Sequence, residues 1–266
     1  MIANLSSDGA RSLGRAVLHW LADWARIVHF GAVIAVLALS PSSYARDNRP
    51  AIARQVVQGT VPELWWFTLL TSLIGLVLIR IVVVTALSYG LTRYALEMVV
   101  RVLVLELIPL TAALFVAVRC TLPDGEELVA MRRSGALDAL AQQGVDPMRR
   151  EVLPRVLAGV FSVVTLAAVS CVVSLLLAYW VVYGFSPWGF AGYTRTVGHV
   201  FDPMLTLIFA LKTLLFSLAV SVIPMASALI DPPPSRSRTS AEIRGLIRMF
   251  ALLLLIETAS LVGNYY

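Results

Sequence analysis

Apolar residues in this chain form long runs that are separated by short polar segments. A helix needs roughly 20 mainly apolar residues to cross a bilayer, because the hydrocarbon is about 30 Å thick and each residue rises about 1.5 Å. Five runs are long enough: Leu64–Leu87, Met98–Val118, Val156–Val182, Met204–Ile230 and Leu246–Gly263. The pattern predicts an all-α integral membrane protein with five transmembrane helices.

A sixth apolar run, Ile27–Leu39, is shorter and follows a stretch that mixes arginine with tryptophan. These residue types are typical of helices that lie at the level of the lipid headgroups. We therefore expect the N-terminal region 1–62 to form an interfacial helix that continues into an elbow helix. A cleaved secretory signal is the alternative, but the apolar run begins late and no clear small-residue cleavage site follows it.

Composition agrees with a lipid environment. Hydrophobic residues make up 59% of the 266 residues and charged residues only 14%, whereas a soluble domain carries about a quarter charged residues. An ordinary water-soluble enzyme is therefore excluded. The two cysteines and three scattered histidines do not have the spacing of a disulfide scaffold or a metal site, so we expect no metal.

The basic residues are distributed asymmetrically along the chain. Of the 21 Lys and Arg residues, sixteen fall in the segments 1–62, 119–155 and 231–248, and only two fall on the opposite side of the predicted spans. Cytoplasmic segments of inner-membrane proteins are enriched in basic residues. We expect a multi-pass protein of the bacterial inner membrane, with a cytoplasmic N-terminus and a periplasmic C-terminus. The excess of basic residues, with a net charge of +5, then indicates which segments lie on the cytoplasmic side of the membrane. No nucleic-acid partner is expected.

The segment 119–155, between the second and third runs, has its own helical signals. Asp124 resembles an N-cap, the residues Glu126–Gln143 favour a helix, and Gly144 would end it. Asp146-Pro147 then predicts the start of the next helix. Two interpretations remain: a solvated charged loop that packs back on the span ends, or a rigid lever that docks into a cytoplasmic partner.

Residues in and around this segment carry a resemblance to a known family. They are Glu106-Leu107-Ile108-Pro109, Ala113-Leu114, Ala117, Arg119, Glu127, Met131-Arg132, Asp138-Ala139-Leu140, Val145-Asp146-Pro147 and Pro154-Arg155. Their order and spacing resemble the MlaE/YrbE permease family of lipid-transporting ABC systems. That family shows E-L-x-P-x-x-x-A-L-x-x-A-x-R, a Glu eight residues later, and then M-R, D-A-L, V-D-P and P-R.

The resemblance implies a single permease domain over residues 1–266. Its parts are the N-terminal region 1–62, spans 1 and 2 in 64–118, a cytoplasmic coupling segment in 119–155 and spans 3–5 in 156–263. Such a permease works as a dimer of identical or related chains and moves lipids, phospholipids above all. Its other partners are a cytoplasmic ABC ATP-binding subunit and a periplasmic MCE-domain protein.

The resemblance also assigns the contact with the ATP-binding subunit to the coupling segment, at Glu127, Met131, Arg132, Asp138 and Asp146. Local capping is an equally good explanation for Glu127 and for Asp146. The chain contains no Gly-x-x-x-x-Gly-Lys-[Ser/Thr] phosphate loop. We therefore expect no cofactor in this chain, and ATP and Mg²⁺ in the partner.

One departure from the family pattern falls within the coupling segment. Gly135-Ala136 stands where the family usually has Glu-Gln, so a charged contact expected on the ATPase surface is missing. This departure indicates a divergent member. It also keeps open a second role for the chain, as a degenerate structural partner in a heterodimeric transporter.

Five ionisable residues lie inside the predicted spans: Arg80, Arg101, Glu106, Lys212 and Glu257. Each costs roughly 2.5–3.5 kcal/mol at a helix centre, so a charged partner or a wet cavity is expected. Glu106 lies mid-span, and Pro109 can kink the helix beside it. Glu106 either pairs with Lys212 or Arg80, or lines a lipid cavity. The candidate cavity residues are Glu106, Pro109, Arg80 and Lys212.

A membrane-embedded lipid-modifying enzyme is the alternative from another class of function. It would need a nucleophile with a base, or paired metal ligands, within the spans. The chain has neither Gly-x-Ser-x-Gly nor His-Glu-x-x-His, and its three histidines lie outside the five runs. We therefore expect a transporter permease subunit with no catalytic residue.

Overall fold

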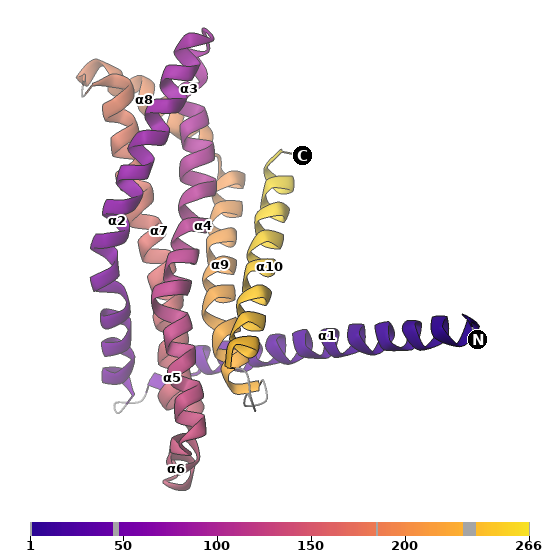
Figure 1. Ribbon diagram of the computed structural model, residues 1–266. Helices are drawn as coiled ribbons and strands as arrows, with labels where there is room; N and C mark the ends of the chain where they lie inside the picture. The colour runs from indigo at the N-terminus through magenta and orange to yellow at the C-terminus, as the bar shows by residue number, and fades with distance from the viewer. Residues whose placement is uncertain (1, 45–47, 185, 231–237, 266) are drawn as a thin grey trace.

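The protein is an elongated helical bundle (Figure 1). The computed structural model describes residues 2–44, 48–184, 186–230 and 238–265, and all the regular structure in these ranges is helical. Its α-helices are α1 (Ile2–Leu39), α2 (Arg49–Ser88), α3 (Thr92–Val99), α4 (Ile108–Val116), α5 (Leu122–Arg133), α6 (Ala136–Gln142), α7 (Leu153–Tyr183), α8 (Phe190–Val200), α9 (Pro203–Ile230) and α10 (Arg238–Tyr265). The long helices α2, α7, α9 and α10 run side by side, while α1 crosses one end of the bundle (Figure 1).

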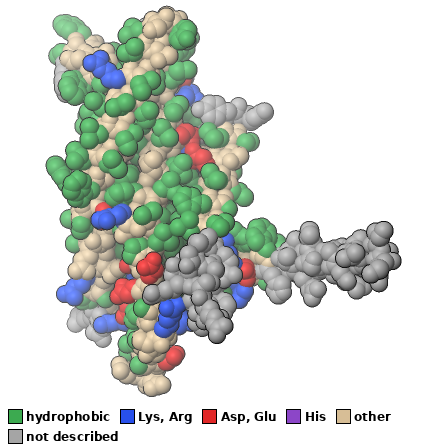
Figure 2. Space-filling view, viewed as in Figure 1, with side chains coloured by type: hydrophobic (Ala, Val, Ile, Leu, Met, Phe, Trp, Pro, Cys, Tyr) green, Lys and Arg blue, Asp and Glu red, His purple; other side chains and the backbone are tan. Residues whose placement is uncertain are grey.

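All five predicted spans lie in helices that are long and apolar enough to cross a membrane. The helical stretch Trp20–Leu39 in α1 meets the same criterion, so length and composition alone admit six spans among the described residues. This stretch exceeds the predicted apolar run because the helix continues without a break through the polar residues that precede Ile27. Figure 2 shows apolar side chains over most of the bundle, with charged side chains gathered near the end that carries α5 and α6.

The second span and the first cytoplasmic helix form one continuous helix. From Tyr94 to Arg133 the chain stays helical for 40 residues, through α3, α4 and α5. The prediction that Asp124 caps a separate helix is therefore wrong, because Asp124 lies within the first turn of α5 and the preceding residues are already helical. The predicted single helix over Glu126–Gln143 is also wrong. It breaks at Gly135, which takes a left-handed conformation with φ of 74° between α5 and α6.

Three wider, π-helical turns interrupt these helices, and each ends two residues before a proline. They are Val100–Leu107 before Pro109, Ala117–Thr121 before Pro123 and Met148–Val152 before Pro154. Proline has no N–H for the carbonyl four residues earlier, and its ring pushes that carbonyl aside. A wider turn accommodates this displacement without ending the helix. Each wider turn thus accompanies a proline, whereas Pro62 in α2 and Pro224 in α9 lie inside helices without such a turn.

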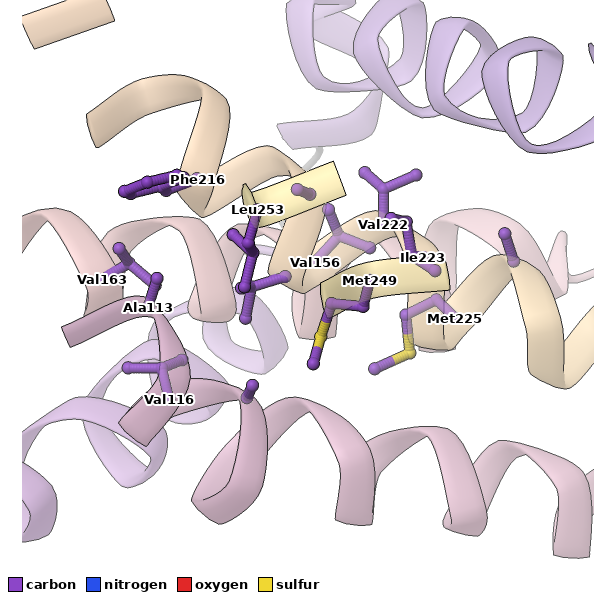
Figure 3. Packing of buried hydrophobic residues seen from close by; sticks show 14 of the residues in the cluster. Ala113, Val116, Val156, Val163, Phe216, Val222, Ile223, Met225, Met249 and Leu253 are labelled. Atoms are coloured by element: carbon purple, nitrogen blue, oxygen red, sulfur yellow. The ribbon is translucent and has the colours of Figure 1, made fainter. Parts of the chain in front are cut away.

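The core of the bundle joins α4, α7, α9 and α10 (Figure 3). Phe216, Met225, Met249 and Leu253 are all fully buried there. Small residues allow the close approach of α7 and α9, as is common between membrane helices. At Gly159 of α7, an added Cβ would lie 2.5 Å from the Ser221 Oγ of α9. The close approach of α7 and α9 therefore requires glycine at this position.

Helix α1 packs against the bundle with one face only. Ile27, Phe30 and Ile34, spaced three and four residues apart, are buried against the core. An ion pair of 2.6 Å between Asp23 and Arg248 joins α1 to α10. The other side of α1 exposes apolar residues such as Val36, which is 69% exposed. Helix α1 therefore has one face that packs against the bundle and an opposite apolar face that is exposed.

Candidate functional site

A cluster of three charges lies inside the bundle. Lys212 of α9 contacts the Glu106 carboxylate, and its Nζ lies 2.8 Å from Oε2 of Glu257 on α10. Lys212 is only 2% exposed, and both glutamates are largely buried. One ammonium group therefore forms ion pairs with two carboxylates from different helices. These ion pairs connect α9, α10 and the second span.

Pro109 contributes to this cluster through the backbone. Because proline cannot donate to the carbonyl four residues earlier, the carbonyl of Leu105 lacks its usual helical partner. The Nζ of Lys212 lies 3.5 Å from this oxygen, and it also lies 5.7 Å from the centre of the Phe216 ring. The proline of the sequence motif thus presents a carbonyl to the buried cation.

The structure decides between the two cations that were predicted as partners of Glu106. It pairs Glu106 with Lys212, whereas Arg80 is exposed on α2 and lies outside the cluster. Arg101, the other basic residue of the second span, pairs with Glu97 one turn earlier at 3.1 Å. Glu257 belongs to the cluster although the family motif does not include it. The sequence indicated Glu257 only as a carboxylate inside the last span, without a partner.

A second constellation surrounds Arg155, near the start of α7. Its Nη1 lies 2.7 Å from the Glu151 carboxylate and its Nη2 lies 3.2 Å from the Glu127 carboxylate on α5. Nη2 also lies 3.9 Å from the Met131 sulfur. The Arg155 side chain is only 8% exposed. Glu127 and Met131, predicted to contact the ATP-binding subunit, therefore contact α7 in this chain.

The other predicted coupling residues are divided between internal and exposed positions. Arg132 donates from Nη1 to the carbonyl of Ala228 at the end of α9, at 3.3 Å. Asp146 accepts a 3.0 Å hydrogen bond from the backbone N–H of Met148, which is the predicted local capping role. Asp138 is exposed on α6, a helix with no buried residue. Helix α6 forms the tip of the molecule beyond the bundle (Figure 1).

A polar cavity of about 240 Å³ opens between α2, α5 and α7 near the same end of the bundle. Glu63 of α2 accepts two hydrogen bonds from Arg119, of 3.1 and 3.3 Å, at its edge. Asp124 and Ser162 also line the cavity. The sequence pattern did not predict this cavity, because its residues come from three helices and from separate parts of the chain.

The opposite end of the bundle carries an aromatic cluster, formed by α7 and α8. The rings of Tyr179 and Tyr193 lie 5.0 Å apart, and Tyr183 and Phe190 also contact this group. The Tyr193 hydroxyl donates a 2.9 Å hydrogen bond to the carbonyl of Leu175. Burial raises the pKa of Tyr193, which favours the protonated donor form.

In the part of the chain that the structure describes, no group of three or more His, Cys, Asp or Glu residues is placed to hold a metal ion. No curated protein matches the chain. A protein family does match: the family described as Permease MlaE corresponds to residues 52–262. This region includes most of α2, the charge cluster, the Arg155 constellation and the polar cavity. Because the match covers well over half of the sequence, the chain belongs to the MlaE permease family, the membrane permease subunits of lipid ABC transporters.

Proposed function

We propose that this chain carries phospholipids between the bacterial inner membrane and a periplasmic MCE-domain protein, driven by a separate ABC ATP-binding subunit that holds ATP and Mg²⁺. The observation that carries the proposal is the continuous helix Tyr94–Arg133. It joins the buried charge cluster at Glu106 to the cytoplasmic arm that ends in α6. A movement imposed on that arm would therefore reach the interior of the membrane through one rigid element.

The proposed topology has five spans, in α2, in Tyr94–Arg133 and in α7, α9 and α10. Helix α1 lies in the cytoplasmic interface, which places the N-terminus inside and the C-terminus in the periplasm. Three observations support this assignment: α1 crosses the bundle in Figure 1, buries one face only, and joins α10 through Asp23 and Arg248. The excess of arginine in the predicted cytoplasmic segments supports the same orientation.

The transport path is proposed to lie between two copies of the permease, against α10. Leu254, Leu255 and Val262 form part of an open, nearly flat apolar surface on this helix. The α10 stretch Gly245–Gly263 is one of the least buried spans in the structure. Glu257 lies on the same helix within the charge cluster. A second copy would cover part of this face and leave room for acyl chains beside the cluster.

The proposed docking surface for the ATP-binding subunit is α6, with Asp138 as its charged contact. Glu127, Met131 and Arg132 also join α5 to α7 and to the end of α9, although the Glu127 side chain is 60% exposed. They would pass a movement of the arm to the spans. This assignment modifies the simpler expectation that all of the coupling residues face the partner.

Copurification of the ATP-binding subunit tests the docking surface. Asp138→Arg should reduce copurification and ATP-dependent transfer of phospholipid from vesicles, because it reverses the charge at the tip of the arm. Asp202→Arg is the matched control, since Asp202 is exposed outside the arm, between α8 and α9. If Asp138→Arg copurifies and transports like the control, α6 is not the docking surface.

A further inference from the structure

The polar cavity between α2, α5 and α7 is not used by the proposed transport path. Figure 1 shows α2 and α10 at opposite edges of the bundle, so the cavity lies away from the α10 face where a second copy is proposed. Its volume of about 240 Å³ holds much more than one water. It is slightly smaller than the roughly 300–1,000 Å³ of pockets for drug-sized ligands. The cavity has the size for a small polar group.

The charges around the cavity are unequal. Arg119 is paired with Glu63 through Nε and Nη2. Asp124 adds a second carboxylate, and no ion pair to it occurs among the described residues. Its hydrogen-bonding neighbour in the lining, Gln55, is neutral. Arg155, a cation outside the lining, also acts on Asp124, but it is already paired with two other carboxylates, those of Glu127 and Glu151. The lining of the cavity therefore has one carboxylate more than it has cations. A ligand group with a positive charge and N–H donors would balance it.

Arg119 offers a complementary contact at the edge of the cavity. Its side chain is 59% exposed, and Nη1 has no hydrogen-bond partner within the described part of the chain. An arginine with unused donors suits a phosphate group. The cavity thus combines an inner site for an ammonium group with an outer site for a phosphate.

The surroundings of the cavity indicate that the ligand comes from the membrane. Trp65 and Trp66 follow Glu63 on α2, and they are 71% and 65% exposed. Exposed tryptophan is typical of the level where lipid headgroups meet the hydrocarbon. The cavity also lies where α2 and α7 leave the segments predicted to be cytoplasmic. A lipid of the cytoplasmic leaflet would therefore meet it from the side.

We propose that this cavity binds the headgroup of an ethanolamine phospholipid, with the ammonium group at Asp124 and the phosphate at Arg119. The inference goes beyond the proposed function, because binding at this outer site needs neither ATP nor a partner. The primary ammonium donates hydrogen bonds to the Asp124 carboxylate and to polar oxygens such as Ser162 Oγ. A glycerol headgroup lacks the positive charge that the extra carboxylate needs.

Native mass spectrometry of the purified full chain, with added phosphatidylethanolamine or phosphatidylglycerol, tests the proposal. The wild type should retain the ethanolamine lipid in preference to the glycerol lipid. Asp124→Asn should weaken retention of the ethanolamine lipid about tenfold, the usual size of a lost charge-assisted hydrogen bond. Glu126→Gln is the matched control, because Glu126 is an exposed carboxylate on the same helix, outside the cavity.

A second variant tests the cavity without changing its charge. At Gly59 an added Cβ would lie 3.9 Å from its nearest neighbours, so the backbone tolerates a side chain that enters the cavity. Gly59→Leu should therefore fold, and it should lose the preference for the ethanolamine lipid. Thermal unfolding of each variant checks its folding.

Soluble competitors show which part of the lipid headgroup the cavity recognises. O-phosphorylethanolamine should displace the bound lipid, whereas inorganic phosphate at the same concentration should not. Equal retention of the two lipids would overturn the proposal. So would displacement by phosphate alone, or Asp124→Asn and Gly59→Leu variants that bind like Glu126→Gln. Because no transport is measured, failure here leaves the proposed permease function untouched.

Discussion

Replacing Lys212 with methionine should be the most damaging single change in the intramembrane charge cluster. Methionine keeps most of the length of the side chain and removes the only cation among the three ionisable groups. Glu106 and Glu257 would then lie close together, both largely buried, without their partner. Breaking a buried ion pair by removing one member costs about 3–5 kcal/mol. We expect Lys212→Met to lower the free energy of unfolding by this amount.

The two glutamates should behave differently from the lysine. In Glu106→Gln, Lys212 still has Glu257 at 2.8 Å, and in Glu257→Gln it still has Glu106. Each variant leaves one cation with one carboxylate, so we expect a loss of about 1–2 kcal/mol. Glu106→Gln should therefore assemble and yet transport lipid poorly. A triple variant that combines Lys212→Met, Glu106→Gln and Glu257→Gln should regain stability, because neutral groups often replace buried ions at little cost.

The unfolding rates of the full-length variants in one detergent measure their order of stability. Rates are used because membrane proteins often unfold irreversibly, and their stability is then described by a rate. If most of the loss appears in the unfolding rate, Lys212→Met should unfold about a hundredfold faster or more. Assembly is read from the size of the purified complex, and transport from phospholipid transfer between vesicles. A Lys212→Met variant as durable as wild type would refute the reasoning, as would a Glu257→Gln variant that unfolds equally fast.

Two further changes test the contacts that join the helices. Arg155→Met removes the cation between α5 and α7, and it should reduce transport more than the ATPase rate. The control Arg133→Met, at an exposed position, should change neither rate. Equal loss of both rates in Arg155→Met would contradict a coupling role. Gly159→Ala should cost about 1–3 kcal/mol in thermal unfolding, because its Cβ meets both Ser221 and Thr121 Cγ2. Ser221→Gly should restore part of this stability, since it removes one of the two clashes. The control Gly198→Ala, at an exposed position with no atom within 4 Å, should unfold like wild type.

The five spans and the family follow from the sequence because both depend on local signals. Run length reports a membrane helix directly, since lipid offers no partner for an unpaired backbone group. The motif residues from Glu106 to Arg155 have fixed spacings, and the family match covers all of them. By contrast, the helix start at Asp124 and the unbroken helix over Glu126–Gln143 were predicted wrongly, whereas the stop at Gly144 and the new start at Asp146-Pro147 agree with the structure. A capping pattern at Asp124 cannot reveal that the preceding span continues into the same helix.

Contacts between distant residues were not accessible from the sequence. Glu127 and Met131 occupy positions that suit a surface helix, and only the packing of α5 on α7 shows that Arg155 holds them. The cavity residues Glu63 and Arg119 are 56 positions apart. For Glu106, by contrast, a partner could be predicted, because few cations occur inside the spans and a buried charge needs one. The sequence could not choose between Lys212 and Arg80.

Two of the π-helical turns, both in the helix Tyr94–Arg133, change which neighbouring helix its charged residues face. A π-turn inserts one residue, which rotates the side chains that follow by about 100° relative to those before it. The first turn contains Glu106, which faces α9, and the second contains Arg119, which faces α2. Beyond the second turn, Glu127 faces Arg155 on α7. One continuous helix contacts three different neighbours, and each wide turn changes its rotational phase between these contacts. Movement of the cytoplasmic arm would act on all three contacts together.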